Sequence, residues 1–336
     1  MKDEKIQMAH GSGGRLSHDL VNQIMLPAFN NAALAEMHDG AAITVRGVRL
    51  AFTTDSYVVK PLFFAGGDIG KLAVCGTVND LAMTGAEPLY LSAGFVIEEG
   101  FSIAELRRIT ASMQAAAAEA GVSIVTGDTK VVERGAVDGL FINTAGVGAI
   151  LDGVSISASR AALGQDIILS GFLGDHALAV MSERHGLTLP AAIASDCAPL
   201  GGLVKTLLTA VPQIAVLRDP TRGGLATTLN EIAEQAGGGI MIQEETIPVR
   251  PEVQAVCDIL GFDPLYLANE GKMIIFVEGT YTTRVLAILH SHAYGCEARV
   301  IGKVTTRPVG QVGMQTLIGG VRLLDMLTGD QLPRIC

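Results

Sequence analysis

Four acidic residues lie in apolar surroundings beside small residues, near the expected ends of strands and helices: Asp55, Asp80, Asp128 and Glu270. Mg²⁺ is usually held in proteins by one or two carboxylates together with the phosphates of a substrate. Aspartates that project from different elements can form such a site, although each could instead be an ordinary capping or turn carboxylate. Asp80 is the hardest to explain in that way. It interrupts an otherwise apolar helix, where Asp is a poor helix former and is costly to bury without a partner.

Lysines accompany two of these carboxylates at a spacing of two residues. Lys130 follows Asp128, and Lys272 follows Glu270. On a β-strand both members of such a pair face the same side. Each pair is therefore either a surface ion pair or a cation and an anion aimed into one site, and the spacing leaves both interpretations open.

The stretch RDPTRGGL, residues 218–225, combines charge with a pair of glycines. It places Asp219 and Arg222 at an expected junction between a strand and a helix, where backbone N–H groups can bind an anion. Asp219 or Thr221 could instead cap the helix that follows.

The chain ends on Cys336, in the sequence PRIC. This is not a prenylation signal, because that modification needs the cysteine four residues from the end. The five cysteines contain no CxxC pair, so a zinc ribbon or a thioredoxin-like site is not expected, and their odd number fits a reducing cytoplasm. We interpret Cys336 as a thiol on a movable arm, in which Pro333 prevents a regular helix and Arg334 offsets the terminal carboxylate.

Composition argues against several classes of protein. The net charge of −10 argues against non-specific nucleic-acid binding, and every long apolar stretch has polar interruptions, so no membrane span is expected. The stretch AGGDIGKL resembles a phosphate-binding loop but has Ala65 and Leu72 where that loop needs Gly and Ser or Thr. The motifs HExxH and GxSxG are absent. A conventional kinase, dehydrogenase or hydrolase is therefore not expected.

The elements that must position these residues alternate between strands and helices. Apolar and turn patterns predict the order β-α-β-α-β-β in the first half, with a strongly amphipathic helix between Ser102 and Gly121. The second half alternates again after a looser stretch near residues 151–165. We therefore predict a flexible segment and a helix over 1–40, an N-terminal domain over 41–155, an α/β domain over 156–325 and a mobile tail over 326–336.

Taken in order, the stretches HGSGGR, TDSYVV, AGGDIGKLAVCGTVNDLAMTGAEPLYLSAGF, IVTGDTKVV, LFINTAGVG, RDPTRGGLA, NEGK and PRIC resemble the hydrogenase maturation factor family HypE. The similarity runs along essentially the whole chain, and the terminal cysteine is its most specific part. It implies the ATP-binding superfamily of aminoimidazole ribonucleotide synthetase, selenophosphate synthetase and thiamine-monophosphate kinase. The implied fold is α/β (α+β). Residues 41–155 would be the ATP-binding and dimerisation domain, whose ferredoxin-like sheet pairs with that of a second subunit into a dimeric β-barrel, and an α/β domain follows.

The resemblance also implies an activity. HypE-like proteins are cytoplasmic homodimers that use ATP and Mg²⁺ to dehydrate a carbamoyl group on their own terminal cysteine to a thiocyanate. The carbamoyltransferase HypF loads the group, and the cyanide passes to iron on the HypC–HypD complex during NiFe-hydrogenase maturation.

Carried over onto this sequence, the resemblance assigns Cys336 as the carrier and Glu270 and Lys130 as the residues that handle the proton. It assigns ATP binding to Asp55, Asp80, Asp128, Lys71, Asn79 and Thr129, and Mg²⁺ binding to the three aspartates. Two alternatives remain open. One is a small-molecule kinase or synthetase of the same superfamily, in which the tail is incidental; the other is a non-enzymatic carrier.

Overall fold

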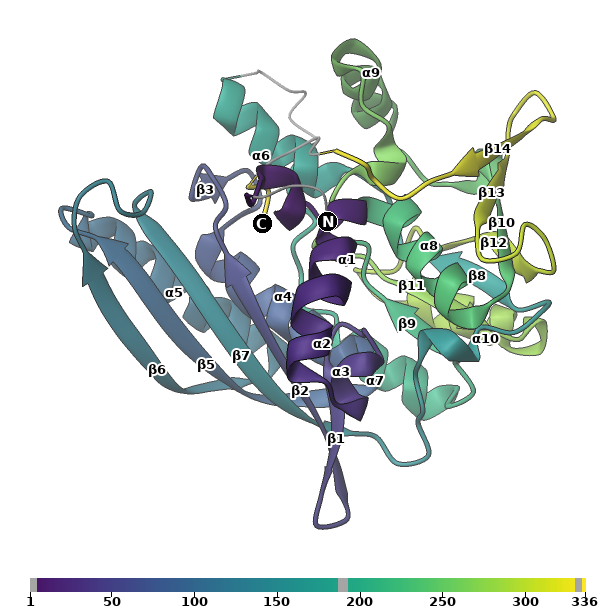
Figure 1. The fold of residues 1–336 in the computed structure, drawn as a ribbon, viewed down its shortest axis with the longest axis horizontal. Helices are drawn as coiled ribbons and strands as arrows, with labels where there is room; N and C mark the ends of the chain where they lie inside the picture. Colours follow the sequence, from purple (N-terminus) through teal and green to yellow (C-terminus); the bar gives the residue numbers. More distant parts are fainter. Residues whose placement is uncertain (1–4, 187–192, 330–333) are drawn as a thin grey trace.

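Two β-sheets, each with helices packed against it, divide the chain into an N-terminal and a C-terminal half (Figure 1). The computed structural model describes residues 5–186, 193–329 and 334–336. Both ends of the described chain lie where the two halves meet, and Ile6 and Cys336 line the same cavity. No helix among the described residues is both long enough and apolar enough to cross a membrane.

The N-terminal sheet has five strands in the order β1-β2-β7-β5-β6. Its strands are β1 (Ala41–Val45), β2 (Val48–Tyr57), β5 (Ala86–Glu98), β6 (Ser123–Val132) and β7 (Leu140–Ile150). Only β5 and β6 pair in parallel. The helices α4 (Ile69–Met83) and α5 (Ile103–Ala120) lie on one face of the sheet, and the opposite face of β5, β6 and β7 is open (Figure 1). A two-stranded hairpin, β3 (Phe63–Phe64) and β4 (Gly67–Asp68), precedes α4.

The strand order refines the expected fold. The elements β2-α4-β5-α5-β6-β7 follow the predicted β-α-β-α-β-β order, and the α+β class is confirmed. A ferredoxin-like sheet has the chain order β-α-β-β-α-β. Here the two strands that follow each other without a helix, β6 and β7, come last in the chain, and β7 lies between β2 and β5 in the sheet. Alternate residues of β7 are buried, as expected for a central strand with one covered face. β6 is consequently an edge strand, and the sheet does not close into a barrel within one chain.

Capping residues explain where the two helices begin. The Asp68 carboxylate accepts hydrogen bonds from the backbone amides of Gly70 and Lys71, at 2.7 and 3.1 Å, at the start of α4. Ser102 caps α5, which ends at Gly121 with a φ of +72°, as the sequence predicts. α4 is buried along almost its whole length, so it carries Asp80 into the interior near its C-terminal end.

The C-terminal half is built on a seven-stranded sheet in the order β14-β13-β10-β12-β8-β11-β9. Its strands are β8 (Asp166–Leu169), β9 (Val216–Arg218), β10 (Gly239–Gln243), β11 (Ile274–Val277), β12 (Arg299–Thr305), β13 (Val312–Gln315) and β14 (Val321–Leu324). Its longer helices are α6 (Asp175–His185), α7 (Gly201–Ala210), α8 (Gly224–Ala236), α9 (Pro251–Leu260) and α10 (Gly279–His290). α7 packs against α4 and β5 and so joins the two halves.

Gly13 and Gly14 of the N-terminal segment are closely packed, although the sequence suggests a flexible stretch. A Cβ on Gly13, whose φ is +77°, would lie 2.5 Å from the Cβ of Arg222. A Cβ on Gly14 would overlap the carbonyl of Leu327. Glycine is needed here because the backbone approaches the C-terminal half too closely for a side chain. The helical run that follows consists of α1 (Arg15–Leu20), the π-helical η2 (Val21–Met25), α2 (Leu26–Phe29) and the short α3 (Ala32–Ala35).

Candidate active site

A cavity of about 280 Å³ lies between the two halves and is lined mainly by charged side chains. β2 supplies Asp55, α4 supplies Asp80, and the loop that follows β9 supplies Asp219 and Arg222. Glu270, which precedes β11, and the terminal Cys336 also line it. The structure therefore gathers two of the predicted aspartates, the predicted base and the terminal thiol around one space.

The aspartates of this cavity are crowded. Asp80 accepts a hydrogen bond from the Thr53 hydroxyl at 2.9 Å, yet burial, followed by the charges of Asp219 and Asp55, raises the pKa of Asp80 well above its ordinary value. Burial and the Asp39 carboxylate likewise raise the pKa of Asp219, although Arg218 opposes this. Each carboxylate thus resists ionisation because it is buried beside others of the same charge. A divalent cation placed among them would relieve that repulsion.

The donor set of the cavity fits Mg²⁺ rather than a metal that needs a complete protein cage. No group of three His, Cys, Asp or Glu side chains among the described residues is arranged as a ready-made metal site. Mg²⁺ commonly takes one or two carboxylates and completes its octahedron with water and phosphate oxygens. Asp55, Asp80 and Asp219 can provide those carboxylates.

Two arginines beside the cavity have different partners. Arg218 is buried and forms ion pairs with Asp39 and Glu231, both at 2.8 Å, so its charge is balanced within the fold. The Arg222 guanidinium lies 3.9 Å from the sulfur of Cys336. The Cys336 thiol in its ionised form, and after it the Asp55 and Glu270 carboxylates, holds the pKa of Arg222 above its ordinary value. Arg222 is thus the arginine that faces the terminal thiol.

The end of the tail is docked against the segment that follows β2. The Val58 amide donates to the Cys336 carbonyl at 3.2 Å, and the Lys60 amide donates to the Arg334 carbonyl at 3.3 Å. Residue 58 therefore pairs with residue 336 and residue 60 with residue 334, so the two segments run in opposite directions, as antiparallel strands do. Ile335 is buried in a hydrophobic core that the N-terminal sheet and α4 share with α6 and α9. In this structure the described part of the predicted mobile tail is therefore held in place by its backbone, by the buried Ile335 side chain and by polar contacts of the Arg334 side chain.

Arg334 does not neutralise the terminal carboxylate, contrary to the expectation from the sequence. Its guanidinium donates to Asp138 at 2.7 Å and to the Val58 carbonyl at 3.0 Å, and it lies over the ring of Phe141. A planar guanidinium suits this combination of a carboxylate and an aromatic face. The cation nearest the sulfur is consequently Arg222.

The docked thiol is held in its protonated form. Burial raises the pKa of Cys336 to about 12; Arg222 lowers it, and the Glu270 and Asp55 carboxylates raise it further. Glu270 is itself buried, and its Oε1 atom has no hydrogen-bond partner among the described residues. Burial, followed by Asp219, Asp55 and Asp196, raises the pKa of Glu270 well above its ordinary value, while Arg222 opposes the shift. The cavity therefore holds an unpaired carboxyl group beside the end of the tail.

Asp128 does not join Asp55 and Asp80 within one chain. Asp55 is in register with Thr144, Ala93 and Gly127 across β2, β7, β5 and β6, whereas Asp128 is one residue further along. Adjacent strand residues face opposite sides, so Asp128 lies on the open face of the sheet and Asp55 on the face covered by helices. Three strand spacings also separate them by roughly 14 Å.

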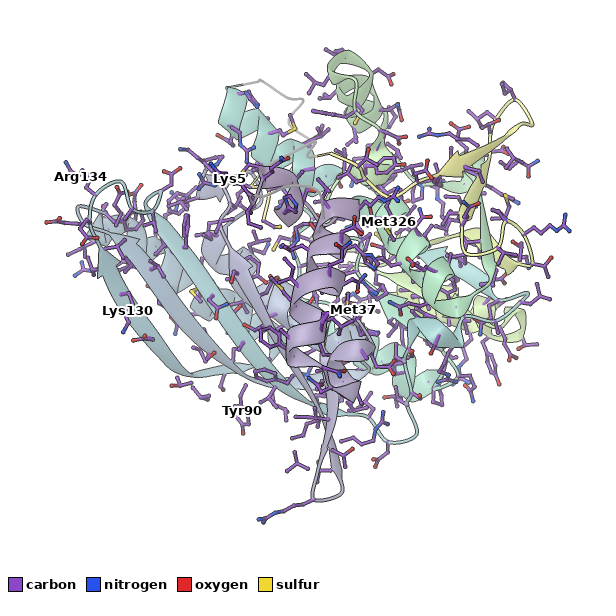
Figure 2. The ribbon with its side chains drawn as sticks, viewed as in Figure 1. Lys5, Met37, Tyr90, Lys130, Arg134 and Met326 are labelled. Atoms are coloured by element: carbon purple, nitrogen blue, oxygen red, sulfur yellow. The ribbon has the colours of Figure 1, made fainter. Side chains whose placement is uncertain are left out.

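The two sequence pairs of an acid and a lysine have different outcomes. Lys130 forms an ion pair with Asp128 at 3.0 Å, and both side chains are about two-thirds exposed, at 68% and 69%. Lys130 projects from the outer strand of the N-terminal sheet, away from the cavity (Figure 2). Lys272 pairs with Asp196 at 3.2 Å, not with Glu270. Within one chain, Asp128 and Lys130 thus form a surface ion pair. Glu270 and Lys272 do not form an ion pair with each other.

The remaining predicted ATP-binding residues lie outside the cavity. The Asn79 amide donates to the carbonyls of Ala198 and Glu270 at 3.1 and 3.2 Å and so fixes the backbone that carries Glu270. The Lys71 ammonium donates to the Gly66 carbonyl at 3.2 Å. Thr129 lies on β6 beside Asp128.

The sequence marks Asp219 and Arg222 at the strand-to-helix junction of RDPTRGGL as a possible anion site, but it does not assign them to the same site as Asp55 and Asp80. The roles of Asp39 and Arg218 could not be found from the sequence, because their partners come from distant segments.

Comparisons with known proteins identify relatives of this chain. Models of the AIR synthase related protein family match the N-terminal domain over residues 37–150 and the C-terminal domain over residues 163–315. The carbamoyl dehydratase HypE of Rhodobacter capsulatus is 50% identical over 338 residues, which cover 100% of this chain and 99% of that protein. The one from Escherichia coli is 48% identical and covers 98% of this chain and 99% of that protein.

Solved structures show the same similarity. A crystal structure of the hydrogenase maturation protein HypE in complex with ATP has a TM-score of 0.84 and 51% identity, and the match covers 97% of this chain and 98% of that chain. HypE in a crystal structure of a HypE–HypF complex has a TM-score of 0.87 and 49% identity, covering 92% and 99%. Together with the matching family models, these identities show that the chain belongs to the HypE family of AIR synthase related proteins.

Proposed function

We propose that this protein is an ATP-dependent carbamoyl dehydratase that acts on its own Cys336 and supplies the cyanide ligands of NiFe-hydrogenase iron. The γ-phosphoryl group of ATP is transferred to the carbamoyl oxygen with release of ADP and loss of one N–H proton, which gives an iminophosphate and makes that oxygen a good leaving group. The remaining N–H proton is then lost, the C–O bond breaks and phosphate departs, leaving S–C≡N. The balance is one thiocarboxamide and one ATP converted into one thiocyanate, one ADP, one phosphate and one proton.

The observation that carries this proposal is the position of Cys336. The last residue of the chain lines the same cavity as Asp55, Asp80, Asp219 and Glu270. A tail that docks beside its reaction partners makes the chemical step intramolecular, which contributes a large proximity gain. A small-molecule kinase or a simple carrier has no need to place its terminal thiol there, and identity near 50% over the whole chain to carbamoyl dehydratases also favours this reading.

Glu270 is our candidate for the proton acceptor. It lies in the cavity with the thiol, and one of its oxygens has no protein partner among the described residues. Its raised pKa makes the ionised carboxylate a stronger base. Arg222 can stabilise the negative charge that develops on the phosphorylated oxygen and on the departing phosphate.

Asp55, Asp80 and Asp219 would hold Mg²⁺ with the phosphates of ATP, and the 51% identical relative that was crystallised with ATP supports nucleotide binding. Bound Mg²⁺ neutralises phosphate charge and orients the transferred group. For Lys71 and Asn79 we propose supporting roles, because their described contacts are to backbone groups.

We propose that Asp128, Thr129 and Lys130 act across a homodimer. β6 is a ten-residue edge strand exposed along nearly its whole length, and such an edge presents unpaired N–H and C=O groups that can pair with a second chain. Phe52 and Tyr90 on the same sheet are about half exposed, at 47% and 50%. The family resemblance implies that two such sheets pair into a dimeric barrel, and we propose that Lys130 of one subunit meets the cavity of the other in that barrel.

HypF is the proposed loading partner, because a relative of 49% identity forms a complex with it. The HypC–HypD iron complex is the proposed acceptor of the cyanide. All five cysteines are free, which fits a reducing cytoplasm.

Intact mass measurement tests the proposal. After incubation with HypF, a carbamoyl donor and MgATP, the protein should gain one carbamoyl group and then lose one water. Cys336→Ala is the control and should gain nothing. Glu270→Gln should accept the carbamoyl group but lose water about 10²–10⁴ times more slowly. A Gln variant that dehydrates within a few-fold of the unmodified protein would remove Glu270 as the base, and a group acquired by Cys336→Ala would identify another carrier.

A further inference from the structure

The buried histidine that contacts the tail has no part in the reaction described above. His176 lies in the first turn of α6 and is fully buried. Its Nε2 atom is 2.9 Å from the Ile335 carbonyl, and its Nδ1 atom is 2.8 Å from the Ser195 hydroxyl. The ring of Phe64 packs edge-to-face against it at 5.4 Å. His176 therefore touches the residue immediately before the carrier cysteine.

The partners of His176 determine its tautomer. The Ile335 carbonyl can only accept, so Nε2 must carry the proton. In the neutral ring Nδ1 then accepts a hydrogen bond from Ser195, whose oxygen accepts in turn from the Cys197 amide at 3.1 Å. Burial lowers the pKa of His176, although Asp196 and the bond to Ile335 oppose the shift, so the ring is neutral. The hydrogen bond from Ser195 thus fixes the tautomer in which the Nε2–H group of His176 points at the tail.

The tail presents its carbonyls alternately to two sides, as an extended strand does. The carbonyls of Arg334 and Cys336 face Lys60 and Val58, and the carbonyl of Ile335 faces His176. We propose that His176 is a positioning residue that fixes the register of the docked tail and thereby the place of the Cys336 thiol. This inference rests on the proposed function, because it concerns the step in which the carbamoylated tail reacts.

Register matters because the reacting atoms must be within about 3–3.5 Å of each other. A slip of one residue would turn Ile335 out of its buried site. A slip of two residues would move the sulfur by roughly 7 Å. A slip of one residue, or release of the tail, also takes the Ile335 carbonyl away from His176 and leaves a buried N–H group without an acceptor, which is unfavourable.

Two substitutions distinguish the roles of the two ring nitrogens of His176. His176→Gln places an amide N–H near the position of Nε2 and can still bind the Ile335 carbonyl. His176→Asn reaches only the position of Nδ1, so it can bind Ser195 but not the tail. The tail is monitored in the full-length protein by the rate at which iodoacetamide alkylates Cys336, measured on the C-terminal peptide by mass spectrometry. Cys296, which is exposed, is the internal control in the same sample.

We expect His176→Asn to raise the Cys336 alkylation rate about tenfold relative to Cys296, the effect of losing one buried hydrogen bond. His176→Gln should stay close to the unmodified protein. Single-turnover dehydration of the loaded tail should slow in the Asn variant and recover in the Gln variant, while ATP affinity is unchanged in both. Equal alkylation of Cys336 in all three proteins, or equal increases in both variants, would overturn the proposal.

Ser195→Ala provides a second test that leaves the histidine in place, in case the Asn variant does not fold. It removes the group that fixes the tautomer, so a smaller increase in Cys336 alkylation is expected, and no increase contradicts the proposal. Alkylation needs neither ATP nor a carbamoyl group. The expected alkylation pattern without any thiocyanate formation would therefore refute the proposed function alone, and normal dehydration with unaltered alkylation would refute the role of His176 alone.

Discussion

Raising the pH should release the docked tail, because its thiol holds its proton more tightly when docked than when free. The ordinary pKa of a cysteine thiol is 9.0 here, and burial raises that of docked Cys336 to about 12. A group whose pKa is higher in the docked state favours docking fully below about pH 9, and this contribution is lost as the pH rises from about 9 to 12. Ionisation of the Cys336 thiol therefore weakens docking in alkali, and it does not affect docking in mild acid.

The magnitude follows from the two pKa values. The ratio of docked to released tail is proportional to (1 + 10^(pH−12))/(1 + 10^(pH−9)), and this factor decreases about tenfold between pH 7.5 and pH 10. This corresponds to about 1.4 kcal/mol of docking free energy. Arg222, which lies 3.9 Å from the sulfur, opposes the burial effect but does not cancel it.

Alkylation of Cys336, compared with that of a synthetic peptide of the same terminal sequence, measures this change. The ratio of peptide rate to protein rate at each pH is a protection factor that removes the intrinsic reactivity of the thiolate. It should fall about tenfold between pH 7.5 and 10. Circular dichroism at both pH values verifies that the fold is intact, and the protection of Cys296 should stay constant. A protection factor for Cys336 that does not change would refute the argument that burial of the thiol stabilises its protonated form.

Two further outcomes are expected. Asp80→Asn should slow MgATP-dependent dehydration while leaving carbamoyl loading intact, and it should keep or raise the melting temperature because it removes a buried carboxylate repelled by Asp219 and Asp55; a lower melting temperature measured by calorimetry would contradict the repulsion. The Lys130→Ala and Cys336→Ala proteins are expected to be inactive alone. When they are mixed and their subunits exchange, each mixed dimer should regain up to about half of the activity, because one complete site is then assembled from two subunits. If mixed dimers are detected by mass but no activity returns, Lys130 does not act across the interface.

Local features of the fold were predictable from the sequence. The capped helix that begins after Ser102 and ends at Gly121 depends on residues within the helix and its ends, so its limits were predicted closely. The alternation of strands and helices was also visible, because it reflects apolar periodicity within each element. Asp80 stood out for a physical reason that the structure supports: it lies in a buried helix among other carboxylates.

Relations between distant elements were not predictable. Asp128 has the same local appearance as Asp55, but the insertion of β7 between β2 and β5 sets them on opposite faces and three strands apart. A sequence pattern shows which residues of one strand share a face, but not which strands are neighbours. Arg334 likewise appeared suited to the terminal carboxylate, whereas its partner, Asp138, belongs to the connection between β6 and β7.

The docked tail also determines how the cavity can be reached by an added molecule. The residues that dock are covalently attached to the chain that receives them, so they are present at a local concentration on the order of millimolar, whatever the protein concentration. A free peptide with the sequence Arg-Ile-Cys must compete with that local excess and would occupy few molecules at micromolar concentration. Removing the last three residues abolishes the competition, so a shortened protein is the form in which tail-mimicking inhibitors, or carbamoylated peptides offered as separate substrates, can be detected.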